Sequence, residues 1–321
     1  MRVVEDVRRL DSAPHGVVLT VGSFDGVHLG HQRILEQVRH HARKRDGAAV
    51  VLTMRPHPRE FFSPSHAPNL LTSDAKKLAL LEEAGMDAVF FLPFNAETAR
   101  MTREEFVEQI LVGRCGVEHL IVGHDFRFGR DAEGDYHFLA EAAPHYDFEV
   151  TEAVPVLIEG ERVSSTLIRE QILQGDLDKA AQLLGRRYSV LGQVVAGRSI
   201  GQTIGYPTAN IQPYHSAVPA QGVYAAKAHL NGRTHTAAVN IGIAPTIRHD
   251  EAAIEAFLLD FDRNIQGEEI EIVFHHRLRP ERKFPSREAL VQQIGHDVEA
   301  IRAYFASESP QSFEDSIRPS S

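Results

Sequence analysis

Residues 18–31 read VLTVGSFDGVHLGH, a β-branched apolar run that ends in glycines and two histidines. Apolar side chains then recur at helical spacing over residues 34–42, so the stretch predicts a strand, a tight turn and the first turn of a helix. Such a turn presents backbone N–H groups at a helix N-terminus, where a phosphate group binds readily. We therefore expect an anion-binding turn in this segment.

The side chains of this turn favour the same interpretation. Gly22, Gly26 and Gly30 allow the chain to bend and to approach a ligand closely, because glycine has no Cβ. His28 and His31 are three residues apart, so on a first helical turn both imidazoles can donate to oxygens that gain negative charge. The segment contains no Gly-Lys-Ser/Thr, which excludes a Walker-type loop. The alternative is a plain strand–helix turn with two solvated histidines.

The composition is that of a soluble globular protein of about two domains, with 321 residues of which 43% are hydrophobic and 24% charged. The net charge of −10 gives no electrostatic footprint for nucleic acid or an anionic membrane, and we expect neither as a partner. Cys115 is the single cysteine, which excludes an internal disulfide and a cysteine-cluster metal site. No signal-peptide or membrane-span pattern is present, so we expect a cytoplasmic protein without an obligate protein partner.

The first half of the chain alternates predicted strands with predicted helices. The expected strands are residues 48–53, 88–92 and 119–122, and the expected helices are residues 74–84 and a helix that a capping box at Thr102 and Glu105 opens. This alternation predicts a Rossmann-like α/β domain over residues 1–185, with a parallel sheet covered by helices. Ligands of such sheets bind outside the carboxyl ends of the strands.

Two further segments of this half carry polar side chains that suit phosphates. After the strand 119–122, Asp125 could accept a hydrogen bond from a sugar or base, and Arg127 and Arg130 could offer positive charge, although a solvated loop is the alternative. Further along, hydroxyls at Ser164, Ser165 and Thr166 precede a predicted helix. Arg169 follows one turn inside this helix, and Arg162 lies close before it. This arrangement suits a triphosphate cradle, but a plain N-cap without function explains the hydroxyls equally well.

The second half changes character after Gly185. About six short strands are predicted from apolar or alternating runs such as residues 188–195, 222–230, 236–241, 254–261 and 269–274. This spacing favours an antiparallel β-barrel over residues 186–306, with a helix over residues 286–305. Residues 307–321 are rich in Ser, Pro and acids and predict a disordered tail. Residues 192–199 nearly match a Walker loop, but no helix is predicted after them and arginine replaces the lysine.

The barrel contains two candidate reactive positions. Thr208 and Asn210 are two residues apart, so on an extended segment both side chains face the same way and offer oxygens to Mg²⁺ bound with a nucleotide. A loop with a buried threonine is the alternative. Glu255 stands in an apolar strand-like run, where a carboxylate can serve as a general base. An outward-facing strand acid is the alternative for Glu255.

These motifs carry a family resemblance. Residues 22–31 resemble the signature of nucleotidyltransferases that join a phosphate to the α-phosphorus of a nucleotide and release pyrophosphate. The further motifs are residues 123–129, 164–169, 205–210, 240–246 and 278–284, together with Glu255. With all of them in order, residues 17–305 are similar to the prokaryotic bifunctional riboflavin kinases/FAD synthetases.

The resemblance implies two reactions. The barrel would transfer the γ-phosphate of ATP to the 5′-hydroxyl of riboflavin, with Thr208 and Asn210 on Mg²⁺ and Glu255 as base. The N-terminal domain would then join FMN to the α-phosphorus of a second ATP, with His28, His31 and Arg169 stabilising charge. The implied partners are ATP, riboflavin and FMN. Further ligand-binding residues would be Gly22, Phe24, Asp25, Gly26, Asp125, Arg162, Ser164, Ser165, Thr166, Gly205 and Pro207.

Four residues depart from the family pattern. Phe257 stands in place of a histidine, Gln266 of a tyrosine, Ile247 of a phenylalanine and His124 of an acid. The three barrel departures bear on flavin fit and kinase rate. Two other hypotheses therefore stay open. One is a transferase of the cytidylyl or pantetheine type with an unrelated barrel, and the other is a flavin-binding regulator whose barrel binds without catalysis.

Overall fold

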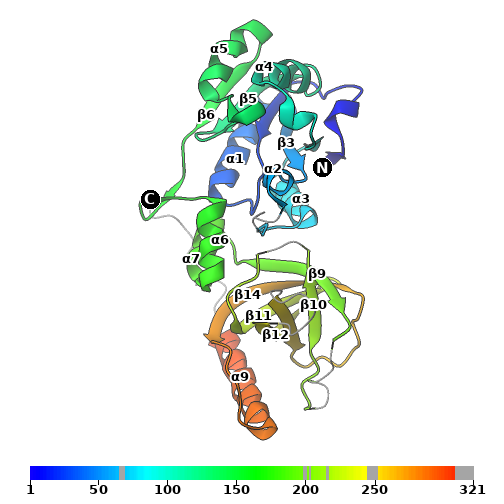
Figure 1. The fold of residues 1–321 in the computed structure, drawn as a ribbon, viewed down its shortest axis with the longest axis vertical. Coiled ribbons are helices and arrows are strands. Elements are labelled where there is room, and N and C mark those ends of the chain that lie inside the picture. Colours follow the sequence, from blue (N-terminus) through cyan, green and yellow to red (C-terminus); the bar gives the residue numbers. More distant parts are fainter. Residues whose placement is uncertain (65–68, 198–200, 202–203, 215–216, 244–251, 308–321) are drawn as a thin grey trace. The chain divides into compact units, whose positions relative to one another are not determined.

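The computed structural model describes residues 1–64, 69–197, 201, 204–214, 217–243 and 252–307. The chain forms two compact units (Figure 1). The first unit comprises Met1–Pro68 and Asp74–Val163, and the second comprises Asn69–Ser73 and Ser164–Ser321. The domain limits of 1–185 and 186–306 stay a prediction. The predicted tail lies outside the described residues from 308 onward.

The first unit is built on a six-stranded sheet in which every pair of neighbours is parallel. Its strands lie in the order β1 (Arg2–Val4), β4 (Ala88–Pro93), β3 (Ala49–Arg55), β2 (Val17–Val21), β5 (Val117–Gly123) and β6 (Glu149–Ala153). The predicted parallel sheet is therefore confirmed. The edge strands β1 and β6 were not predicted, because both are short and carry charged residues.

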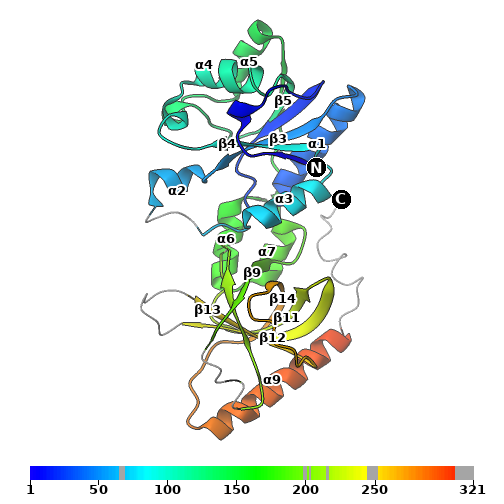
Figure 2. The ribbon, with the colours of Figure 1, turned by 90° about the vertical axis from the view of Figure 1, so that its right-hand side faces the viewer.

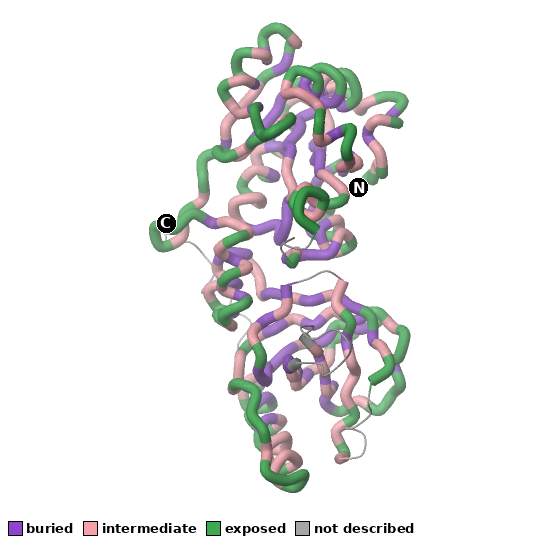
Figure 3. Tube along the Cα trace, viewed as in Figure 1, coloured by how far each residue is buried: buried purple, intermediate pink, exposed green. Residues whose placement is uncertain are grey.

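The central strands of this sheet are buried (Figure 3), because helices cover both of its faces. Val18 packs on one face with α1 (Leu29–Lys44) and α3 (Asp74–Glu83), while Leu19 packs on the other. The second face is covered by η1 (Val7–Arg9), the π-helix η4 (Phe106–Val112) and α5 (Tyr136–Tyr146). The remaining elements are α2 (Pro58–Phe62), η3 (Thr98–Arg100), α4 (Arg103–Glu105), η5 (Arg130–Ala132), β7 (Leu157–Ile158) and β8 (Glu161–Arg162).

The predicted capping box is confirmed at the start of α4. The Glu105 N–H donates to Thr102 Oγ1 at 3.2 Å, and the Thr102 N–H donates to the Glu105 carboxylate at 2.8 Å. These two bonds satisfy backbone donors that a helix start would otherwise expose. The helix then widens into η4, which buries Phe106 and Ile110.

The second unit begins with two helices, α6 (Ser165–Gln174) and α7 (Leu177–Leu184), and continues into a closed antiparallel barrel. The barrel strands are β9 (Ser189–Val195), β10 (Ala209–Pro213), β11 (Gly222–Leu230), β12 (Arg233–Ile243), β13 (Ala252–Leu258) and β14 (Glu269–Arg279). They close in the order β10-β13-β12-β11-β14-β9, which confirms the predicted six-stranded barrel. The strand predicted over residues 254–261 ends earlier, because Asp260 takes a left-handed φ of 56°.

Side chains alternate between the two faces of the barrel wall. On β13, Ile254 and Ala256 are buried, whereas Glu255 and Phe257 are only half-buried. The predicted C-terminal helix is α9 (Arg287–Ser307), which runs along the outside of the barrel (Figure 2). Its Ile301 packs with Ala225 and Leu259 and is fully buried. One face of the barrel wall is thus covered by a helix.

Candidate active sites

The turn between β2 and α1 has an unusual backbone. Left-handed φ angles occur at Phe24 (49°), Gly26 (84°) and Val27 (40°). Of the three glycines, Gly26 takes a left-handed φ, whereas Gly22 and Gly30 do not. The turn takes this shape because Phe24 and Val27 are almost fully buried, at 1% and 2% exposure, and hold the backbone between them.

The other two glycines of the turn provide space. A Cβ on Gly22 would stand 3.2 Å from the Phe24 ring, and a Cβ on Gly30 would stand 3.1 Å from the His28 ring. The same Cβ on Gly30 would stand 3.6 Å from the carbonyl oxygen of Val163, the residue before Ser164. Both glycines therefore allow close packing of the two ring side chains.

The two histidines of the turn lie together. His28 is the N-cap of α1 rather than a first-turn residue as the spacing predicts, because the helix begins only at Leu29. Its Nδ1 accepts a hydrogen bond from the His31 N–H at 3.3 Å, and the two imidazoles stack with centroids 3.6 Å apart. A neutral imidazole that accepts through one nitrogen carries its proton on the other. The His28 ring therefore has Nε2–H as its donor at the helix N-terminus.

Acidic and basic side chains meet at the carboxyl end of β5. Arg162 of β8 forms an ion pair of 2.5 Å with Asp125. Desolvation raises the pKa of Asp125, but the hydrogen bond and charge of Arg162 outweigh it, so the pKa is lowered overall. His124 pairs with Glu152 at 2.9 Å. Arg127, a candidate phosphate ligand, forms an ion pair with Asp135 at 2.9 Å.

His57 lies at the carboxyl end of β3 and was not among the predicted site residues. It caps α2, since its Nδ1 accepts from the Arg59 N–H at 3.2 Å. Burial lowers the pKa of His57, while the charge of Asp25 raises it and the charge of Lys77 lowers it. Asp25 and Lys77 are themselves buried, at 2% and 5% exposure. The position of His57 directly after an apolar strand is the sequence signal that could have identified it.

The hydroxyl segment before α6 forms a helix cap. Ser164 is the N-cap, and its Oγ accepts from the Leu167 N–H at 3.2 Å. Ser165 and Thr166 follow in the first turn. Arg169 lies one turn inside, and its Nε donates to the Asn69 carbonyl at 2.9 Å. The N-cap alternative therefore describes the local geometry, and a phosphate-binding role stays a prediction.

The barrel brings three polar residues into one row. Asn210 on β10 and Asn240 on β12 both stand directly opposite Glu255 on β13. Directly opposed residues of antiparallel strands point to the same side, with Cβ atoms about 5 Å apart. All three are half-buried. The role of Asn240 was not separately predicted, because register across strands is not visible in a single segment.

The segment before β10 packs closely around the predicted metal ligands. A Cβ on Gly197 would stand 1.8 Å from the Asn210 amide, and a Cβ on Gly201 would stand 3.2 Å from Thr208 Oγ1. Gly205 takes a left-handed φ of 86°, as a turn requires. Pro207 is exposed. The two glycines thus allow the chain to pack closely around Thr208 and Asn210.

The departures from the family pattern have different surroundings. Phe257 packs edge-on against Tyr206, with ring centroids 5.3 Å apart. The Gln266 N–H donates to Asn264 Oδ1 at 3.0 Å in a turn. Ile247 lies outside the described residues. The aromatic ring at position 257 therefore helps to hold the segment that carries Thr208.

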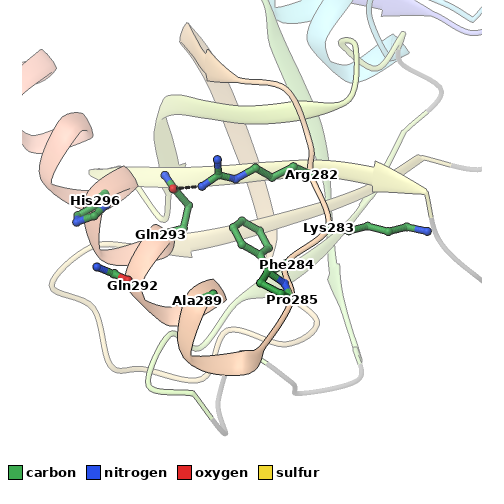
Figure 4. Close-up of a pocket in the computed structure, with 8 residues that line it drawn as sticks. All are labelled: Arg282, Lys283, Phe284, Pro285, Ala289, Gln292, Gln293 and His296. Atoms are coloured by element: carbon green, nitrogen blue, oxygen red, sulfur yellow. Dashed lines mark hydrogen bonds between the residues drawn. The ribbon is translucent and has the colours of Figure 1, made fainter.

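A cavity of about 400 Å³ lies between α9 and the segment that leads into it (Figure 4). Its lining residues are Arg282, Lys283, Phe284, Pro285, Ala289, Gln292, Gln293 and His296. A Cβ on Gly242 of β12 would stand 2.5 Å from Glu281, and one on Gly295 would stand 3.6 Å from the Tyr206 hydroxyl. The cavity thus adjoins the segments that carry Asn240 and Thr208.

Three further features bear on function. The described residues contain no group of three or more His, Cys, Asp or Glu that could hold a metal ion. Burial raises the pKa of Cys115 to about 12, so this thiol is an unreactive core residue. Of the helices within the described ranges, none combines the length and the hydropathy that crossing a bilayer requires.

Comparison with known proteins gives matches over nearly the whole chain. A family model described as FAD synthetase matches residues 10–167, and one described as riboflavin kinase matches residues 184–305. A "bifunctional riboflavin kinase/FMN adenylyltransferase" of Pseudomonas fluorescens is 40% identical, covering 95% of this chain and 98% of the relative. A protein of the same description from Listeria monocytogenes is 38% identical, covering 90% and 92%.

Among solved structures, a crystal structure described as a macrolide-efflux protein from Streptococcus pneumoniae is similar to this chain. It has a TM-score of 0.83 and 31% sequence identity, and the match covers 94% of this chain and 98% of that one. The similarity therefore extends over both the parallel sheet and the barrel.

Proposed function

The chain belongs to the family of bifunctional riboflavin kinase/FMN adenylyltransferases, and we propose that its two units divide the two reactions. The barrel phosphorylates riboflavin to FMN with ATP. The parallel-sheet unit then adenylylates FMN to FAD with a second ATP and releases pyrophosphate. We place both reactions in the cytoplasm, since both use ATP and the single cysteine forms no internal disulfide.

The row of Asn210, Glu255 and Asn240 is the observation that carries the kinase assignment. Glu255 acts as general base and takes the proton of the riboflavin 5′-hydroxyl while that oxygen attacks the γ-phosphorus of ATP. The bond from the γ-phosphorus to the bridging oxygen breaks, and ADP leaves with that oxygen. The flanking carboxamides offer hydrogen-bond partners on both sides of the carboxylate. The cavity beside α9, with the Phe284 ring in its wall, holds the flavin ring system.

The residues around Thr208 fit a magnesium ion that arrives with ATP. Thr208 and Asn210 supply neutral oxygens, and Mg²⁺ in nucleotide sites takes its other ligands from phosphates and water. Gly197 and Gly201 allow the chain to pack closely here, because a Cβ would overlap the Asn210 amide or the Tyr206 carbonyl oxygen. When bound, the ion neutralises negative charge on the transferred phosphate. The two side chains hold the nucleotide in register with the acceptor hydroxyl.

The His28 cap is the observation that carries the adenylylation assignment. An FMN phosphate oxygen attacks the α-phosphorus of ATP, the bond to the β-phosphate breaks, and pyrophosphate leaves. The Nε2–H of His28 and the first-turn amides of α1 stabilise the negative charge that builds up on the phosphate oxygens. His31 stacks on His28 and fixes its plane. For Ser164, Ser165, Thr166 and Arg169 of the second unit, binding of nucleotide phosphates stays a prediction.

Asp25, His57, Asp125 and Arg162 serve binding rather than bond making. The Asp125–Arg162 pair fixes an acceptor and a donor at the end of β5, where a ribose or base can hydrogen-bond. Gly22, Phe24 and Gly26 shape the turn and give the nucleotide access to the backbone. Gly205 and Pro207 shape the corresponding segment of the barrel.

Product analysis tests the assignment. The purified protein is incubated with riboflavin, ATP and Mg²⁺, and the flavins are separated by chromatography. We expect FMN first and FAD second, with one pyrophosphate per FAD. Replacing ATP by CTP, or FMN by phosphopantetheine, should abolish the second step. Tight flavin binding without ATP consumption would instead favour the regulator hypothesis, which the Phe257 and Gln266 departures motivate.

A further inference from the structure

A buried ion pair anchors α9 to the end of β14. Asp297 of α9 is 6% exposed. Arg279 Nε donates to both Asp297 oxygens, at 3.0 Å and 3.1 Å, and Arg279 Nη2 donates to Oδ2 at 2.7 Å. A carboxylate held by several charge-assisted hydrogen bonds has a fixed position, since each bond restricts its rotation. This pair is therefore a rigid reference point beside the cavity.

Gln293 connects this ion pair to the cavity wall. Its Nε2 donates to Asp297 Oδ1 at 2.7 Å, and its Oε1 accepts a hydrogen bond from Arg282 Nη2 (Figure 4). Only one orientation of the Gln293 amide makes both hydrogen bonds, because the Asp297 carboxylate requires a donor and the Arg282 guanidinium requires an acceptor. A glutamate would instead place a second negative charge beside Asp297. Glutamine is thus suited to this link by having one donor end and one acceptor end.

The last group of the chain of contacts lies at the cavity. Arg282 and Phe284 both line it, and the Arg282 guanidinium carbon stands 4.9 Å from the centroid of the Phe284 ring. Arg279 lies over the same ring at 5.7 Å. The aromatic wall and its neighbouring cation are consequently fixed by the same network. Such a wall suits a flat, electron-poor ring that carries carbonyl oxygens at one edge.

We propose that Gln293 is a positioning residue for riboflavin binding, which rests on the kinase function proposed above. By joining the Asp297–Arg279 pair to Arg282, it holds the Arg282 guanidinium where its N–H groups reach the carbonyl oxygens of the flavin ring. Arg282 contacts the substrate, whereas Gln293 acts through Arg282. Loss of Gln293 therefore weakens riboflavin binding and leaves the rate of phosphate transfer unchanged.

Steady-state kinetics of FMN formation by the full-length protein test the proposal. Arg282→Ala should raise KM for riboflavin about five- to tenfold, as loss of one hydrogen bond predicts, with kcat and KM for ATP unchanged. Gln293→Met, which keeps the length of the side chain, should raise the same KM by a similar factor. Because the two residues act in series, the double variant should be no worse than Arg282→Ala. Arg302 lies on the same helix as Gln293 and forms an ion pair with Asp260, which follows β13. Arg302→Ala removes that ion pair and serves as the control.

Three results would overturn the proposal, and they differ in whether the flavin site is refuted as well. If Arg282→Ala raises KM for riboflavin but Gln293→Met does not, then Gln293 does not position the arginine and the flavin site stands. If neither variant changes KM for riboflavin, then the cavity does not bind riboflavin and that part of the proposed function fails too. Additive effects in the double variant would likewise refute action in series. Thermal melting of each variant separates these results from unfolding.

Discussion

The two sites of this protein are built in opposite ways. The His28 turn gathers its groups from one short segment, because a strand, a turn and a helix cap follow one another directly. The Glu255 row gathers its groups from three strands that the closure of the barrel brings into register. The first site depends on local backbone shape, and the second depends on the whole barrel. Substitutions should therefore separate the two activities cleanly.

The largest effect is expected in the barrel. Glu255→Gln keeps the shape of the side chain but removes the base, so kcat for FMN formation should fall about a thousandfold. Adenylylation of supplied FMN should stay unchanged. Glu269→Gln, which alters an exposed carboxylate of β14, is the matched control. Retention of FMN formation within tenfold would show that Glu255 is not the base.

A somewhat smaller effect is expected at the local site. His28→Ala removes one donor to the phosphate oxygens as well as the α1 cap, so FAD formation from FMN should fall by about several hundredfold. FMN formation should be unaffected. His40→Ala alters an exposed histidine on the same helix and should leave both rates intact. Chromatography of both products in each variant provides the measurement.

The two units should also differ in their response to pH. Burial lowers the pKa of His119 in the parallel sheet to about 4, with the charge of His41 acting in the same direction. Below about pH 6.5 the His119 imidazole binds a proton in the unfolded chain but stays neutral in the folded sheet. The free energy of unfolding therefore falls between about pH 6.5 and pH 4. The free energy of unfolding falls by about 3 kcal/mol at most, because each unit of pKa difference between the folded and unfolded states contributes about 1.4 kcal/mol.

The barrel has a buried group, Tyr224, that titrates at high pH. Burial raises the pKa of Tyr224 to about 12, so this group costs stability only as the pH rises from about 10 to 12. Denaturant unfolding followed between pH 7 and pH 4 should show a loss that His119→Gln reduces and Tyr224→Phe leaves unchanged. Equal acid sensitivity of the wild type and His119→Gln would contradict this account.

The smallest effect is expected for a single metal ligand. Asn210→Ala should raise the Mg²⁺ concentration for half-maximal FMN formation about tenfold, since one of two protein oxygens is lost while phosphates and water remain. Gln212→Ala, further along β10, should leave the titration unchanged. An unaltered Mg²⁺ dependence in Asn210→Ala would remove Asn210 from the metal site and leave Glu255 as the defining residue of the row.

The same contrast explains what the sequence could predict. Apolar runs such as residues 48–53 identify strands that are buried on both faces, and the Thr102 box identifies a helix start, because both signals are local. The six barrel strands follow from their spacing for the same reason. The polar edge strands β1 and β6 escape such patterns, since their pairing partners decide their structure.

Parts of the sites also lay beyond the sequence. Asn240 stands opposite Glu255 because of the register between their strands, and Gln293 contacts Arg282 because of how α9 packs. Neither contact can be predicted from the pattern of a single segment. The left-handed φ of Phe24 and Val27 was missed because these residue types rarely adopt it.

Mixing two variants tests the separation of the two sites most directly. His28→Ala and Glu255→Gln are each incubated with riboflavin, ATP and Mg²⁺, alone and together. We predict that Glu255→Gln alone leaves riboflavin unchanged, that His28→Ala alone stops at FMN, and that the mixture forms FAD. If both activities instead fall together in either variant, or the mixture forms no FAD while supplied FMN is still adenylylated, the two sites do not act as independent centres.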